Sequence, residues 1–143
     1  MTLPLAIIDT NVVVSGLITA DANSPTCQIV DGMLSARFPY LISPDLLHDY
    51  RTVLLRSKIQ KLHGLKTADV DRILTGIVVN AIWREPALSI SAPDSGDDHL
   101  WALLDACRGS TLVTGDRLLL ENPPDFASVI KPLSLLAMGL SGR

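Results

Sequence analysis

Short apolar runs alternate with amphipathic segments along the whole chain. Apolar runs of this length are typical of buried strands, whereas helices carry apolar residues three or four positions apart. The apolar runs predict strands at residues 3–8, 39–43, 111–114 and 128–132. The amphipathic segments predict helices at residues 27–34, 67–79 and 97–108, another from Ser43 onward, and a short one after the last strand. Strands that alternate with helices predict an α/β fold with a mostly parallel sheet.

The predicted helices carry recognisable start and stop signals. Ser43 suits an N-cap and Pro44 the first helical position, while Thr67 suits the N-cap of a later helix. Gly109 suits the stop of the helix that begins near residue 97. The apolar stripe of the helix after Ser43 consists of Leu46, Leu47, Tyr50 and Leu54. Asp49 lies just beside this stripe, so it is placed near the core-facing side of its helix.

Composition limits the class of protein. The chain has 143 residues and is 48% hydrophobic, which fits a single domain over residues 1–143. Cys27 and Cys107 are too few for a disulfide framework and indicate small core residues in a reducing cytoplasm. Residues 1–18 have no basic segment and contain Asp9 and Asn11, which argues against a signal peptide. No uninterrupted apolar stretch is long enough to cross a bilayer, so we expect no membrane-spanning segment.

A carboxylate interrupts the first apolar run, LAIIDTNVVVSGL, at Asp9. An unpaired buried carboxylate is so costly that it must neutralise or find a partner. Asp116 also follows a predicted strand, and ligands of α/β folds bind beyond the carboxyl ends of the strands. Asp98 stands in the first turn of a predicted helix. If these three residues and Asp49 converge, their mutual repulsion raises their pKa values unless a divalent cation is present.

Each of these carboxylates also has a local explanation. Asp9 can form an Asx-turn, Asp49 can be an ordinary exposed helix residue, and Asp116 can open a turn. Asp97 or Asp98 can serve a helix N-terminus. The case for a shared site therefore rests on the four positions together.

Basic residues gather along and after the predicted helix that starts at Ser43. Arg51, Arg56, Lys58 and Lys61 lie close together on an otherwise acidic protein of net charge −3, with His63 and Lys66 nearby. Such a cluster predicts contact with a phosphate backbone, and the alternative is a solvated helix face.

Four motifs occur in a recognisable order: IIDTNVVVSGL, ISPDLLHDYRTVLLR, DSGDDHLWALLDAC and TLVTGDRLLL. Together they resemble the PIN-domain ribonucleases, specifically the compact VapC-type toxins of toxin–antitoxin systems. The resemblance covers nearly the whole chain. It implies a single-domain, three-layer α/β fold with a mostly parallel central sheet.

In that family, four acidic residues hold one or two Mg²⁺ or Mn²⁺ ions that support phosphodiester hydrolysis. The resemblance assigns catalytic roles to Asp9, Asp49, Asp98 and Asp116 and supporting roles to Asn11, Thr114 and Asp97. It makes Asp9, Asp98 and Asp116 the metal ligands. Asp49 departs from the family, which usually carries glutamate there. Asp98 is preferred over Asp97 because DHLWA matches the family's spacing from acid to apolar helix residues.

The resemblance further implies an RNA substrate, a cognate antitoxin as partner, a homodimer formed through the first helices and a cytoplasmic location. Three other interpretations compete with it. Haloacid-dehalogenase-type phosphatases need an aspartate where Asn11 stands. Response-regulator receivers have last strands like TLVTGD and VIKPLSLL but also need a paired acid after the first strand. The third alternative is a PIN-like module without catalysis that only binds a partner.

Overall fold

The computed structural model of the protein describes residues 3–87 and 91–140. Its strands are β1 (Ala6–Ile8), β2 (Leu41–Ile42), β3 (Ile82–Trp83), β4 (Thr111–Val113) and β5 (Ser128–Ile130). β4 lies between β1 and β5, β2 pairs with β3, and every pairing is parallel. A parallel bridge between Ala6 and Tyr40 brings the second pair against β1. The predicted α/β class with a parallel sheet is confirmed.

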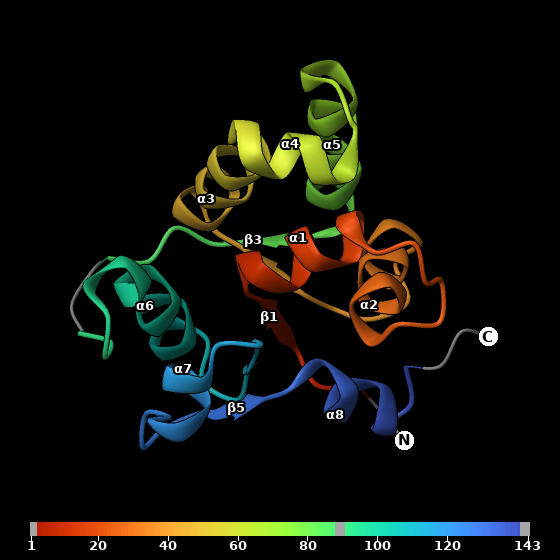
Figure 1. Cartoon of the computed structure of the whole chain (residues 1–143). Helices are drawn as coiled ribbons and strands as arrows, with labels where there is room; N and C mark the ends of the chain where they lie inside the picture. Colours follow the sequence, from red (N-terminus) through yellow and green to blue (C-terminus); the bar gives the residue numbers. More distant parts are fainter. Residues whose placement is uncertain (1–2, 88–90, 141–143) are drawn as a thin grey trace.

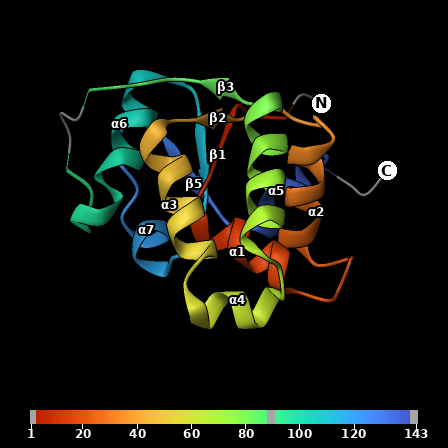
Figure 2. The same ribbon diagram turned by 90° about the horizontal axis from the view of Figure 1, so that it is seen from above.

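Helices flank the sheet on both sides (Figures 1 and 2). They are α1 (Thr10–Ile18), α2 (Pro25–Leu34), α3 (Pro44–Leu54), α4 (Ser57–His63), α5 (Thr67–Asn80), α6 (Asp98–Ala106), α7 (Arg117–Glu121) and α8 (Pro132–Ala137). Figure 1 places α6 to the left of β1, with α2 and α8 to its right. In Figure 2, α3, α5 and α2 stand side by side. Among the described residues, no helix combines the length and the apolar character needed to span a membrane.

The central strands β1 and β4 lie in the middle of the hydrophobic core. Ile7, Ile8, Leu112 and Val113 have no exposed surface. Their apolar runs are continuous because both faces of the parallel sheet are covered by helices. The sheet register pairs Ile8 with Val113, so the chain leaves β1 and β4 at neighbouring points of one edge. This edge is where polar residues from the two segments can meet.

Helix starts agree in part with the sequence signals. Ser43 is the N-cap of α3, since its Oγ accepts from the Leu46 amide at 3.2 Å, and Pro44 is the first helical residue as predicted. Thr67 is the first residue of α5 rather than its N-cap. The amide of Lys66 instead donates to the Asp69 carboxylate at 3.2 Å. α6 ends at Ala106, three residues before Gly109, which has a φ of +95°.

Helix α1 is absent from the sequence prediction, which also missed α4 and α7. Three consecutive valines, which favour strands, occupy its middle. The helix forms because Val12, Val13 and Val14 are all buried against the rest of the core. Gly16 allows α2 to approach closely, since a Cβ there would lie 2.6 Å from the Thr26 carbonyl oxygen. Tertiary packing therefore overrides the local preference.

Candidate active site

Asp9 lies at the carboxyl end of β1 and is the N-cap of α1. Its backbone amide donates to the Val113 carbonyl at 2.9 Å, which continues the β1–β4 pairing by one residue. Its side chain is 6% exposed. The interruption of the first apolar run is thus the point where a buried strand turns into a buried helix.

Three hydrogen-bond donors hold the Asp9 carboxylate. Oδ1 accepts from the Thr10 amide at 2.7 Å, and Oδ2 accepts from Thr114 Oγ1 at 2.7 Å and Asn11 Nδ2 at 3.1 Å. The Gly115 amide donates to Asn11 Oδ1 at 3.0 Å, which holds that amide side chain in place. Asn11 and Thr114 therefore stand beside Asp9 in the supporting positions predicted from sequence.

Burial raises the pKa of the Asp9 carboxyl. The hydrogen bonds from Thr114 and Thr10 oppose this rise, whereas the neighbouring carboxylates of Asp49 and Asp116 add to it. Three hydrogen bonds thus leave the negative charge of this group only partly compensated.

Helix α3 brings Asp49 to the same edge. The hydroxyl of Thr10 donates a hydrogen bond to Asp49 Oδ2, although the two residues are 39 positions apart. The fully buried Tyr50 donates to the Ile8 carbonyl and so ties α3 to the last residue of β1. The sequence predicts Tyr50 as a core-facing residue but predicts neither its hydroxyl contact nor that of Thr10. A hydroxyl group whose partner is distant in sequence leaves no local pattern.

Asp116 reaches the site from the segment between β4 and α7. Its amide donates to Thr114 Oγ1 at 2.9 Å, and its Oδ1 accepts from the Leu118 amide at 2.9 Å as the N-cap of α7. The hydroxyl of Thr114, which is fully buried, thereby connects the Asp116 backbone to the Asp9 carboxylate. The sequence prediction placed Asp116 correctly at this strand end.

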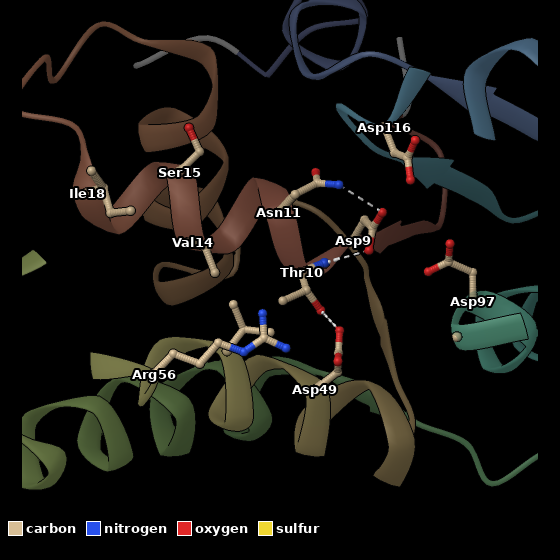
Figure 3. A pocket seen from close by; sticks show the side chains of 12 residues that line it. Asp9, Thr10, Asn11, Val14, Ser15, Ile18, Asp49, Arg56, Asp97 and Asp116 are labelled. Carbon is tan, nitrogen blue, oxygen red and sulfur yellow. Dashed lines mark hydrogen bonds between the residues drawn. The ribbon is translucent and has the colours of Figure 1, made fainter. Parts of the chain in front are cut away.

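Of the two adjacent aspartates in GDDH, Asp97 faces the site (Figure 3). Burial, followed by the charges of Asp9, Asp94, Asp116 and Asp49, raises the pKa of Asp97 to about 6. Asp98 instead accepts from the Ala92 amide at 2.7 Å and does not line the pocket. The predicted placement of Asp98 at the site is therefore off by one residue, since consecutive residues at a helix start point about 100° apart.

A shallow pocket of about 580 Å³ collects these carboxylates (Figure 3). Asp9, Asp49, Asp97 and Asp116 all line it, and they come from four separate segments of the chain. We call it the carboxylate pocket. Val14, Ile18 and Val53 add an apolar wall, and Arg56 extends toward the acidic residues from the end opposite Asp97.

The predicted basic cluster divides in two. Arg56 lines the carboxylate pocket, while Lys58 and Lys61 are exposed on α4, the helix that follows it. Arg51 lies elsewhere, because its Nε donates to Asp71 of α5 at 2.8 Å. Two residues along a helix correspond to a rotation of about 200°, so Arg51 and Asp49 face away from each other. Arg51 therefore lies apart from the carboxylate pocket, although it is close to Arg56 along the chain.

A family model described as the PIN domain matches residues 6–118, which include all four carboxylates of the pocket. The chain belongs to the PIN-domain family. No curated protein matches it. PIN domains are commonly nucleases, and PIN-domain nucleases generally use divalent metals. The receiver and phosphatase interpretations lose their support, because the PIN-domain match runs from β1 to the first two residues of α7.

The donor set of this PIN domain suits a hard cation. Every polar side chain at the acidic end of the pocket offers oxygen or amide groups, the ligands that Mg²⁺ and Mn²⁺ prefer. Within residues 3–87 and 91–140, no three carboxylate, imidazole or thiolate groups lie close enough together to hold an ion directly. Mg²⁺ usually keeps several waters and binds through one or two carboxylates, so the residues fit a partly hydrated ion.

Proposed function

We propose that this protein is a metal-dependent endoribonuclease whose reaction takes place in the carboxylate pocket. The observation that carries the proposal is the convergence of four aspartates on one pocket, with Asp9 buried and Asp97 shifted to a pKa of about 6. Uncompensated carboxylates destabilise a fold, so their presence at a concave site favours a functional role.

Asp9, Asp97 and Asp116 are the proposed metal ligands, and Asp49, which lines the same pocket, would act through a bound water. A bound Mg²⁺ or Mn²⁺ activates water and neutralises charge on the phosphate. The chain's own part is to hold the ligands still. Thr114 and Asn11 fix the Asp9 carboxylate, and the hydroxyl of Thr10 orients Asp49.

The cations near the pocket have a matching role. Arg56 stands at one end of the pocket, and Lys58 and Lys61 continue from it on α4. None of the ion pairs in the described part of the chain involves these three side chains. We propose that they bind phosphates of the RNA and offset the repulsion between the substrate and the acidic site.

We further propose that the protein acts in the cytoplasm as the toxin of a toxin–antitoxin pair and is restrained by a cognate antitoxin. We also propose that it forms a homodimer through its first helices. The compact PIN domain and the resemblance of its motifs to VapC-type toxins support them. A neighbouring gene for a small DNA-binding protein and a dimer mass in light scattering are the expected observations. A monomer at micromolar concentration contradicts the dimer.

The decisive experiment is a cleavage assay on mixed single-stranded RNA with Mg²⁺, with Mn²⁺ and with EDTA. We expect cleavage with either metal and none with EDTA. Asp97→Asn and Asp98→Asn form a matched pair of variants, because the residues are adjacent and only Asp97 lines the pocket. Asp97→Asn should lose most of the activity and Asp98→Asn should retain it.

The second candidate function is a PIN domain that binds a partner without catalysis. The absence of a preformed ligand cluster among the described residues is the observation that favours it. Folded protein that cleaves no RNA with either metal would support this alternative and overturn the nuclease proposal.

A further inference from the structure

A second depression adjoins the carboxylate pocket, and the proposed function gives it no role. It is lined by Asn11, Ser15, Thr26, Gly115, Asp116 and Pro132. Asn11, Ser15 and Asp116 also line the carboxylate pocket, so the two depressions share a wall. Figure 3 shows Asn11 and Ser15 on the side of α1 that is turned away from Arg56. The surface therefore continues past the carboxylates on the side opposite the α4 cations.

A third, larger depression continues in the same direction. Its volume is about 810 Å³, and it shares Thr26, Gly115 and Pro132 with the second one. α7 and α8 form its walls together with the start of α2, and both helices lie below α1 in Figure 1. We call the second and third depressions together the side groove. It runs from the acidic centre into the third depression, which Arg117 and Lys131 line.

We infer that the side groove binds a single-stranded RNA segment that extends from the carboxylate pocket, with Arg117 and Lys131 contacting its phosphates. This inference rests on the proposed nuclease function. A strand lying along both surfaces would have cations at each end and its scissile phosphate between them at the aspartates. Such flanking cations are needed because the acidic site at the centre of this continuous surface repels a negatively charged strand.

The charged side chains that line the third depression favour a polyanion. Arg117 is 88% exposed, and Lys131 is also exposed at the N-cap of α8. Arg117 Nε donates to Glu121 Oε2 at 3.0 Å, which uses one of the five N–H donors of the guanidinium. The remaining donors can contact a phosphate. Glu121 also lines the groove and opposes an anion, so its removal should strengthen binding.

Apolar side chains beside these cations favour a single strand over a duplex. Pro25, Leu120, Pro132 and Leu133 line the far part of the groove, and Leu133 is 64% exposed. Exposed base faces of a single strand can pack on such surfaces, whereas a duplex stacks its bases internally.

Gly115 provides a test that leaves the charge unchanged. It lines both parts of the groove, and a Cβ at this position would meet only Asn11 Oδ1, at an ordinary 3.6 Å. A larger side chain should therefore fit the fold and project into the groove. Gly115→Leu should obstruct the strand, and Gly115→Ala is the matched control.

The experiment measures binding of a labelled single-stranded RNA of roughly 12 nucleotides, within the range that one small domain covers. EDTA is present throughout so that metal-dependent cleavage does not destroy the probe. Gly115→Leu should weaken binding by about fivefold or more, the scale of one lost base contact, while Gly115→Ala binds as the wild type does. The free energy of unfolding, measured in parallel, should be similar for both variants.

A charge series completes the test. Arg117→Gln/Lys131→Gln should flatten the salt dependence of log affinity by about 1.4, for two lost contacts at about 0.7 each. The control Arg37→Gln/Arg72→Gln removes the same charge from exposed residues outside the groove and should leave the slope unchanged. Glu121→Gln should tighten binding. A duplex of the same sequence should bind more weakly than the single strand.

Several outcomes overturn the inference: no binding by the wild type, wild-type affinity of Gly115→Leu, an equal slope change in the control pair, or preference for the duplex. Wild-type affinity of every groove variant would favour a protein segment as the occupant. The cleavage assay separates this result from the nuclease proposal. If the wild type cleaves RNA and the groove variants bind RNA as the wild type does, only the side-groove inference fails. If the groove variants lose RNA binding and no protein cleaves RNA, only the nuclease proposal fails.

Discussion

Helix α3 separates two charged regions with opposite electrostatics. On one side, Asp49 joins Asp9 and Asp97 in the carboxylate pocket, where burial and like charges raise the pKa of Asp9 and Asp97. On the other side, the hydrogen bond from Arg51 lowers the pKa of Asp71, and both side chains are about half exposed. Paired, solvated charges contribute little to stability or chemistry. The carboxylates that mark the functional surface are those that converge on one pocket, where none of them has an ion-pair partner among the described residues.

Asp9→Asn and Asp71→Asn test this contrast most strongly. Asp9→Asn should reduce metal-dependent RNA cleavage by more than about 100-fold, because even groups that only orient a metal ligand are worth 10–100-fold. Asp71→Asn should leave cleavage unchanged. Circular dichroism should show both variants folded. An unfolded Asp9→Asn protein whose refolded fraction cleaves normally would make Asp9 a structural residue instead.

Thermal unfolding with Mg²⁺ or Mn²⁺ tests whether the metal ion binds in the carboxylate pocket and not at the Arg51–Asp71 pair. An ion at about 100 times its Kd stabilises the folded state by about 2.7 kcal/mol, which corresponds to a rise in Tm of roughly 5 °C or more for a domain of this size. Asp9→Asn/Asp116→Asn should abolish the rise, and Asp71→Asn should retain it. An equal shift in all three proteins would place the ion outside the pocket.

The pH dependence of stability should have opposite signs in the two regions. The folded-state pKa of Asp97 is about 6, above its ordinary value of 3.8, so ionised Asp97 destabilises the metal-free fold. The destabilisation is complete above about pH 6 and disappears as the pH falls toward 3.8. Asp97→Asn should therefore be more stable than the wild type at neutral pH by about 1 kcal/mol, after allowance for solvent screening, and equally stable in acid.

Asp71 provides the control for that measurement. Its lowered pKa means that ionised Asp71 stabilises the fold at neutral pH, and this contribution is lost as the pH falls below its usual range. Asp71→Asn should be less stable than the wild type at neutral pH. Denaturant unfolding across this pH range measures both variants, and a stability change of the same sign in the two would remove the contrast.

The smallest expected effect concerns the basic residues. Arg56→Gln/Lys58→Gln/Lys61→Gln should weaken RNA binding and flatten its salt slope by about 2, for three phosphate contacts at about 0.7 each. Arg51→Gln should change neither quantity, because Arg51 pairs with Asp71 of α5 and does not line the carboxylate pocket. Fluorescence anisotropy at several salt concentrations measures both. If Arg51→Gln alone changed the slope, the α3–α5 face would also contact the substrate.

Sequence reasoning was most successful where the chemistry is local. Asp9 and Asp116 were placed correctly because Asp9 directly follows the buried β1 and Asp116 comes three residues after the buried β4, and Ser43 was recognised from its capping pattern. It failed at helix α1, whose valines favour a strand when taken alone. It also could not show that Arg51 lies apart from the carboxylate pocket, since proximity along a chain does not indicate which side of a helix a residue occupies.

The alternation of apolar runs and the two strand-end aspartates were enough to determine the α/β class and half of the acidic site. Tertiary structure alone decided that Asp97 rather than Asp98 enters the pocket, because one residue at a helix start rotates the side chain by about 100°. It alone decided the bond from Thr10 to Asp49 and the junction of the carboxylate pocket with the side groove. These features join segments distant in sequence, and their geometry follows from how the helices pack against the sheet.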